Sequence, residues 1–204
     1  MQQNSRLGEI TSVGRALPLS MGRARSILRA RTCDLHSRAE EVLGTETCAT
    51  LAGYAAMLQS NLSVTDTVRR ATEPLLPPHM MKGLALDSLR LRKDLAELGA
   101  PACGHRAQLD LDEPAGAIGA LYVLEGARLG GKLLARKVEA ELGLTAEHGA
   151  AYLNGDGAEA GRRWRRFLSG LEERLVLSED LVRAVAAARA TFRLIIRRYE
   201  KIPK

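Results

Sequence analysis

Apolar residues recur along this chain at intervals of three and four, which is the spacing of an α-helix rather than of a strand. The clearest case is a stripe near the C-terminus: Leu181, Val185, Ala188, Phe192, Ile195 and Tyr199. Trp164 and Phe167 are interpreted as part of the same core. No run alternates with the period of two that a half-buried strand needs. The pattern therefore predicts an all-α fold.

Glycine, proline and capping residues divide the pattern into six or seven helices. Ser20 is the expected N-cap of the first helix and Thr45 or Thr47 that of the second, which is expected to break near Asn61. The predicted helices cover approximately residues 21–43, 47–73, 79–98, 113–142, 164–171 and 178–199, with a short further one within 145–153. We expect one compact domain over residues 20–204, preceded by a flexible tail over residues 1–19.

Glycines interrupt the helix predicted over residues 113–142, although its other residues are strong helix formers. Each glycine in a helix interior costs about 1 kcal/mol relative to alanine, so the chain needs bare backbone at these positions. Gly126 and Gly130 are four residues apart and share one face, which predicts a smooth patch for a large flat ligand. Close helix–helix packing is the alternative explanation, and Gly119 and Gly131 raise the same question.

Composition favours a globular chain in a reducing compartment. With 204 residues, 46% of them hydrophobic, the chain can bury one sizeable core. No apolar run reaches the roughly 20 residues that cross a bilayer, so we expect no membrane partner. Three cysteines without metal-ligand spacing, Cys33, Cys48 and Cys103, favour a cytoplasmic location.

The net charge of +6 suits an anionic ligand or an acidic protein partner. Nucleic acid is a third class that a basic chain could bind. The arginines are scattered over many predicted helices, and no basic groove with interleaved aromatic residues is visible. We therefore expect no nucleic-acid partner.

His36 is the candidate metal ligand of the chain. Of the four histidines, it is the one placed in the middle of a predicted helix with a carboxylate, Glu40, one turn later. A histidine that ligates a metal commonly has its second ring nitrogen held by a carboxylate, and Glu40 is placed to do this. An ordinary i,i+4 pair on a half-buried face is the alternative, which this spacing alone leaves open.

Two segments taken together resemble the heme oxygenase family, in particular its bacterial, biliverdin-producing members. The first reads Leu28-Arg-x-x-Thr32-x-x-x-His36-x-x-x-Glu40, and the second reads Gly119-Ala-Leu-Tyr-Val-Leu-Glu-Gly-Ala-Arg-Leu-Gly-Gly131. A weaker match follows over residues 164–171. The order and length of the predicted helices agree from about residue 20 to residue 199, so the resemblance covers nearly the whole domain.

The resemblance implies a heme held between the first helix and a kinked, glycine-rich helix. His36 falls at the position of the proximal iron ligand, and Glu40 falls on the residue that orients it. Gly126 and Gly130 fall on the distal glycines, which press backbone against the heme and leave room for dioxygen. In this arrangement the imidazole supplies the fifth iron ligand and the glycines keep the sixth position open.

The resemblance also implies which residues hold the heme propionates. Arg29 and Tyr122 match positions that contact them. Further positive charge is expected from a set that the sequence does not resolve: Lys132, Arg162, Arg165 and Arg166. One departure concerns the residue after the first distal glycine, which is an aspartate in mammalian-type members and is Ala127 here. This difference implies another water network beside the bound oxygen.

The implied activity is oxidative cleavage of heme b, as both substrate and cofactor, to biliverdin, iron and carbon monoxide. It needs O2 and electrons from a ferredoxin- or flavodoxin-type donor, and a bilin-accepting photoreceptor is a further candidate partner. Two alternatives stay open: a heme-binding or heme-carrying protein without oxygenase activity, and a related fold that acts on a non-heme small molecule. His36 with Glu40 argues against the second, because a non-heme pocket needs no axial ligand.

Overall fold

The computed structural model describes residues 22–102 and 107–203, which are helical throughout apart from connections and one isolated bridge. The long helices are α1 (Arg23–Leu43), α2 (Leu51–Thr72), α3 (Pro78–Glu97), α4 (Pro114–Leu142), α6 (Ala160–Arg174) and α7 (Ser178–Tyr199). The short elements are the 3-10 helices η1 (Thr45–Ala49) and η2 (Gly157–Glu159) and the helix α5 (Ala151–Asn154). The all-α prediction is confirmed, whereas the predicted tail over residues 1–19, the Ser20 cap and Cys103 lie outside the described residues.

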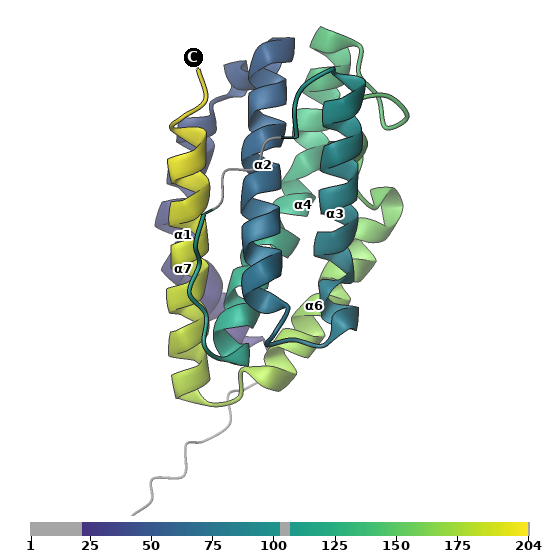
Figure 1. Ribbon diagram of the computed structural model, residues 1–204. Helices are drawn as coiled ribbons and strands as arrows, with labels where there is room; N and C mark the ends of the chain where they lie inside the picture. Colours follow the sequence, from purple (N-terminus) through teal and green to yellow (C-terminus); the bar gives the residue numbers. More distant parts are fainter. Residues whose placement is uncertain (1–21, 103–106, 204) are drawn as a thin grey trace, which may run out of the picture.

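The long helices stand side by side in one bundle, with α1 largely behind α7 in the view of Figure 1. Helix α7 packs against α1, α4 and α2, and α2 packs in turn against α3. The apolar stripe predicted for α7 explains this position, because Leu181, Ala188, Phe192 and Ile195 are all buried. The helix that carries His36 and the helix that carries the glycines therefore share one support.

Burial changes abruptly along α4. Its residues from 115 to 125 are buried in the core, with the exception of the half-buried Tyr122, whereas those from 126 to 134 are half-buried or exposed. The change falls at Gly126, the first of the two glycines that the sequence singled out. The first part of α4 thus belongs to the core, and the second part borders solvent.

Gly119 and Gly131 lie where another segment passes very close to α4. A Cβ at Gly119 would overlap the carbonyl group of Ala184 in α7, so bare backbone is needed at this crossing. A Cβ at Gly131 would lie 2.7 Å from the carbonyl oxygen of Leu153 in α5. The packing explanation therefore holds for these two glycines.

The start of α2 differs from the prediction. Thr45 and Thr47 lie in η1, and neither caps α2. Thr50 is the N-cap instead, and its side-chain oxygen accepts a hydrogen bond from the backbone N–H of Gly53 at 3.1 Å. Three threonines fall within six residues, and each is a good N-cap, so the choice depends on where the preceding turn ends.

The break predicted near Asn61 is wrong, because α2 runs unbroken from Leu51 to Thr72. Asparagine disfavours helix interiors when its side chain bonds to its own backbone. Here the Asn61 side chain accepts a hydrogen bond from the Tyr199 hydroxyl at 2.8 Å, which removes this competition. The short helix predicted within residues 145–153 is confined to α5, which begins only at Ala151.

The start of α1 is capped by a side chain from α6. Its N-cap residue, Gly22, offers no side-chain hydrogen bond. The carboxylate of Glu172 takes that role and accepts hydrogen bonds from the backbone N–H groups of Ala24 and Arg25, at 3.1 and 2.9 Å. An anion at this end of a helix also complements the helix dipole. Helix α6 therefore fixes the end of α1 that leads toward His36.

We expect Glu172→Ala to lower the free energy of unfolding by about 1 kcal/mol, the usual cost of losing an N-cap. The measurement is urea denaturation followed by circular dichroism. Glu173→Ala is the matched control, because the Glu173 carboxylate is exposed and accepts only a hydrogen bond from Ser169 on its own helix. Equal shifts of the two midpoints would contradict the capping role of Glu172.

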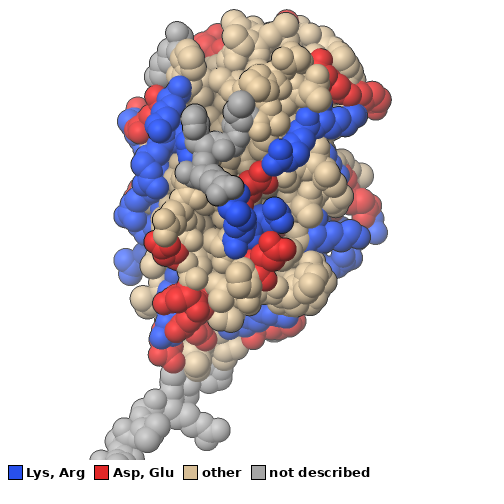
Figure 2. Space-filling view, in the orientation of Figure 1, with Lys and Arg blue, Asp and Glu red and all other residues tan. Residues whose placement is uncertain are grey.

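Charge is dispersed over the face seen in Figure 2, where Lys and Arg side chains are interspersed with Asp and Glu. Within the described ranges, no helix combines the length and apolarity needed to span a membrane.

Candidate functional site

The His36 imidazole lies on the surface of α1 with Glu40 one turn further along. Its Nδ1 is 3.5 Å from Glu40 Oε2, and the two side chains are 58% and 71% exposed. The imidazole contacts the ring of Phe192 of α7 in a T-shaped arrangement, with ring centroids 5.8 Å apart. Because Nδ1 is directed to Glu40, Nε2 is the ring nitrogen available to a ligand.

The face of α4 at Gly126 and Gly130 is open. No described atom lies within 4 Å of a Cβ built at Gly130, and one built at Gly126 meets only Trp164, at 3.7 Å. Leu129 and Leu133, on the same side of the helix, are 42% and 75% exposed. Close packing is therefore the wrong explanation for these two glycines, which border an apolar surface that other parts of the described chain leave uncovered.

A row of aromatic rings adjoins this face. The centroids of Tyr122 and Trp164 are 5.8 Å apart, and those of Trp164 and Phe167 are 5.7 Å apart with nearly parallel rings. All three residues are half-buried. The assignment of Trp164 to the core is wrong, because α6 lies at the edge of the bundle and presents this ring beside Gly126. Phe192, in contrast, is buried as predicted.

Two arginines of α1 lie near the Tyr122 hydroxyl. Burial raises the pKa of Tyr122, and the positive charges of Arg25 and Arg29 act in the opposite direction. The charges of two residues in the N-terminal half of α1 therefore act on a hydroxyl of α4. Arg29 was predicted from the sequence, whereas Arg25 was missed, although it lies four residues earlier on the same helix face.

Four cations around this region are exposed and take no part in ion pairs within the described chain: Arg25, Arg29, Lys132 and Arg165. Cations of this kind can bind the carboxylates of a ligand. Lys132 follows the glycines on α4, and Arg165 follows Trp164 on α6. Arg25 and Arg29 are the cations whose charges lower the pKa of Tyr122, and Lys132 and Arg165 are not among them.

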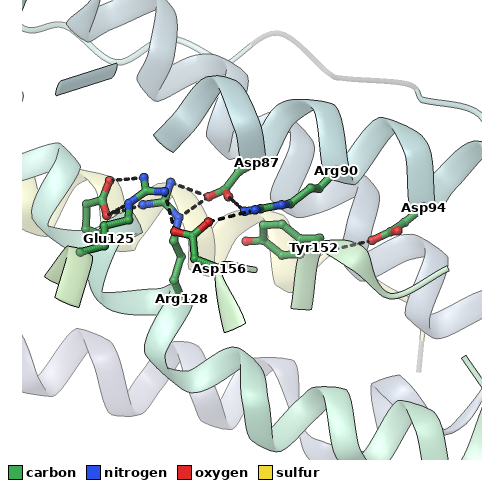
Figure 3. Close-up of polar contacts among 8 residues, drawn as sticks. Asp87, Arg90, Asp94, Glu125, Arg128, Tyr152 and Asp156 are labelled. Atoms are coloured by element: carbon green, nitrogen blue, oxygen red, sulfur yellow. Dashed lines mark hydrogen bonds and ion pairs between the residues drawn. The ribbon is translucent and has the colours of Figure 1, made fainter. Parts of the chain in front are cut away.

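A buried network of charges lies beside Gly126 (Figure 3). Arg128 of α4 pairs with Glu125 one turn earlier and with Asp87 of α3, where Nη2 and Oδ2 are 2.6 Å apart. Burial raises the pKa of Asp87, and Arg128 opposes this. Burial likewise lowers the pKa of Arg128, but Glu125 and Asp87 raise it by more, so its pKa lies above the usual value and its charge is secure.

Sequence reasoning missed this network. One signal was available: Glu125 is the single charged residue in the apolar run from Ala115 to Gly126. A carboxylate within a buried stretch of helix needs a partner, because an unpaired buried charge is very costly. One partner, Arg128, lies three residues later on the same helix, but Asp87, Asp156 and Arg163 come from other segments, so local spacing reveals only part of the network.

Comparisons with known proteins establish the family and the fold of this chain. The family model described as heme oxygenase matches residues 23–201. This chain belongs to the heme oxygenase family. A heme oxygenase of Xanthomonas campestris pv. campestris is 38% identical over 104 residues, which are 50% of this chain and 60% of that protein.

Two solved heme oxygenase structures share the fold. That of Neisseria meningitidis, studied with NO and CO bound, has a TM-score of 0.73 and 23% identity, over 88% of this chain and 93% of that one. That of Leptospira interrogans has a TM-score of 0.72 and 16% identity, over 87% and 98% of the two chains. The heme oxygenase-like fold predicted from two motifs is thus confirmed.

The residues at the site fit the heme that the family name implies. A flat macrocycle can lie against the bare backbone at Gly126 and Gly130, where a Cβ would otherwise project into open space. The aromatic row and the exposed Leu129 and Leu133 offer apolar contacts for the ring. His36 offers nitrogen to iron, and the unpaired arginines of α1 suit carboxylates.

Proposed function

We propose that this chain is an enzyme that oxidises heme to biliverdin, with release of iron and carbon monoxide. The observation that carries the proposal is one pairing: an exposed His36–Glu40 unit and an open glycine face at Gly126 and Gly130, on two helices that pack on α7. Taken alone, the His36–Glu40 pair has a simpler explanation as an ordinary i,i+4 contact, and the open glycine face alone supplies no ligand for iron. Together, in a chain of this family, they supply a ligand for iron and a flat wall for the ring.

On the proximal side, His36 would bind iron through Nε2. Glu40, 3.5 Å from Nδ1, would accept a hydrogen bond from the Nδ1–H group and so fix the tautomer and the plane of the ring. Phe192 packs against one side of the imidazole, with the two rings inclined at 67°. These contacts orient the ligand on a helix that Glu172 holds at its start.

On the distal side, the bound heme supplies an iron that takes up O2 and the porphyrin ring that is cleaved. Gly126 and Gly130 would place no side chain beside the iron of a bound heme, which would leave room there for a small molecule such as O2. Ala127 brings no polar atom, and protons would be delivered by ordered water held on the main chain.

Heme b carries two propionates, and Arg25 and Arg29 with the Tyr122 hydroxyl are the group best placed to bind one of them. Lys132 and Arg165, which are exposed and unpaired, are the candidates for the other. The remaining parts of the proposal are an acidic ferredoxin- or flavodoxin-type donor, which suits a net charge of +6, and a cytoplasmic location, which suits the free Cys33 and Cys48.

We expect one equivalent of hemin to produce a sharp Soret band and to quench the fluorescence of Trp164, the only tryptophan of the chain. Trp164 lies beside Gly126, so energy transfer to a heme at that face would be nearly complete. Addition of a ferredoxin, its reductase and O2 should then convert the band to that of biliverdin, and carbon monoxide should be released.

The alternatives predict other results in the same titration. A heme carrier would show the Soret band and the quenching but form no bilin under these conditions. A protein that acts on a non-heme molecule would show neither, and this outcome would refute the heme assignment.

A further inference from the structure

We propose that Arg163 is a positioning residue, which holds the Trp164 ring against Gly126 and thereby determines how a heme is seated at the glycine face. The role of Arg163 in placing Trp164 does not depend on whether the protein binds heme. Its consequence for the heme rests on the function proposed above.

Arg163 connects α6 to α4 by a direct path. Its Nε and Nη2 bind the two carboxylate oxygens of Glu125 at 3.2 and 3.0 Å, and its Nη1 binds Asp156 at 2.7 Å. The guanidinium passes over Gly83 of α3, where any Cβ would overlap Nη2. A two-pronged contact of this kind fixes direction as well as distance.

The charges around Arg163 are balanced and shielded. Three arginines meet three carboxylates in the network, whose members are Arg90, Arg128, Arg163, Asp87, Glu125 and Asp156. The side chains of Asp87, Glu125 and Arg128 are only 4%, 5% and 8% exposed. Loss of one member would leave an unpaired buried charge, which is strongly destabilising. The network therefore has one preferred arrangement.

Trp164 depends on this anchor because little else holds its part of α6. Leu171 is the one buried residue of this fully described helix, and it lies two turns further along. Trp164 itself is half-buried, touching the position of a Gly126 Cβ at 3.7 Å and stacking on Phe167. Glu125 is adjacent to Gly126, and Arg163 is adjacent to Trp164. The ion pair between Glu125 and Arg163 therefore lies directly beside the contact between Gly126 and Trp164.

The Trp164 ring sets the border of the open face. A shift of this ring would alter the width that is available to a flat ligand beside Gly126. It would also alter the rotation of that ligand in its plane, since the ring stands between Tyr122 and Phe167. Rotation in the plane decides which meso carbon faces the bound oxygen, so we infer that Arg163 contributes to the site of ring cleavage.

The test uses Gly83→Ala and Arg163→Gln in the full chain. Alanine at 83 keeps every charge and improves helix propensity, but its Cβ would overlap the Arg163 guanidinium and displace it, and would also lie 2.9 Å from Nη2 of Arg128. Without ligand, both variants should show a shifted Trp164 emission maximum and stronger quenching by acrylamide. Hemin turnover should fall by about 10- to 100-fold, as for small misplacements of a substrate, and the proportions of the biliverdin isomers should change.

Arg162→Gln is the matched control, because Arg162 is exposed and pairs only with Glu159 on the surface. It should match the parent protein in emission, quenching and isomer proportions. Should Arg163→Gln not fold, Glu125→Gln/Arg163→Gln removes one charge of each sign and leaves the network balanced. Unchanged Trp164 quenching in folded Gly83→Ala and in this double variant would overturn the positioning role.

Altered quenching with unchanged isomer proportions would overturn the consequence for the heme. If the parent protein bound no hemin, the proposed function would fail, and the quenching data would still decide the role of Arg163.

Discussion

His36→Ala should weaken hemin binding by more than about 100-fold, which exceeds the usual cost of losing a residue that only orients a metal ligand. The imidazole is the one nitrogen ligand that the site offers, and its removal leaves iron with contacts to the ring alone. Titration with hemin should show a broad band near that of free hemin in place of the sharp Soret band. Biliverdin should not form.

Two variants define the meaning of this result. His148→Ala is the control, because His148 is also an exposed histidine near a carboxylate, with its Nδ1 4.0 Å from Oε2 of Glu97, but it belongs to neither motif. It should bind hemin as the parent protein does. Glu40→Gln should lower affinity or turnover by about 10- to 100-fold. A normal Soret band in His36→Ala would refute the proximal assignment.

Gly130→Leu should keep hemin binding but lower biliverdin formation by at least about 100-fold, because the new side chain would project over the position of the bound oxygen. No described atom lies within 4 Å of the Cβ position, so the apo-protein accepts leucine without a clash. Leucine also favours helices more than glycine does, and the free energy of unfolding should rise by up to about 1 kcal/mol. Urea denaturation and single-turnover spectra measure the two effects.

Gly119→Ala is the contrasting change on the same helix. A Cβ there would overlap Ala184 of α7, so stability should fall by about 1–3 kcal/mol, the range for overpacking. Turnover per folded molecule should stay close to that of the parent protein. Equal loss of stability in the two glycine variants, or full turnover by Gly130→Leu, would contradict the division between packing glycines and site glycines.

Much of the fold could be predicted because many of its helices begin or end at a glycine or proline, whose effect on the backbone is local. Gly44, Pro78, Pro114 and Gly143 each bound a helix where the sequence placed a boundary. One error arose because a contact with a residue distant in the sequence overrode the local preference of a side chain. Asn61 does not break α2, because Tyr199, 138 residues further along, takes up its side chain.

The candidate site could be predicted only where two of its residues lie on the same helix at a recognisable spacing. The spacing of His36 and Glu40 and that of Gly126 and Gly130 are visible in the sequence. The sequence does not show what each glycine faces, because that depends on which segment crosses α4 and at which residue. Arg163 was missed for the same reason, since its partner Glu125 is 38 residues away on another helix.

Helix α6 touches both walls of the candidate site and is the most loosely held of the long helices. Glu172 reaches the start of α1, Arg163 and Trp164 reach α4, and Leu171 alone is buried. Segments with few buried apolar contacts open locally at far lower free energy than a whole domain unfolds. A brief detachment of α6 would loosen both walls at once while the core around α7 stays intact, so a bulky ligand would enter or leave without unfolding of the bundle.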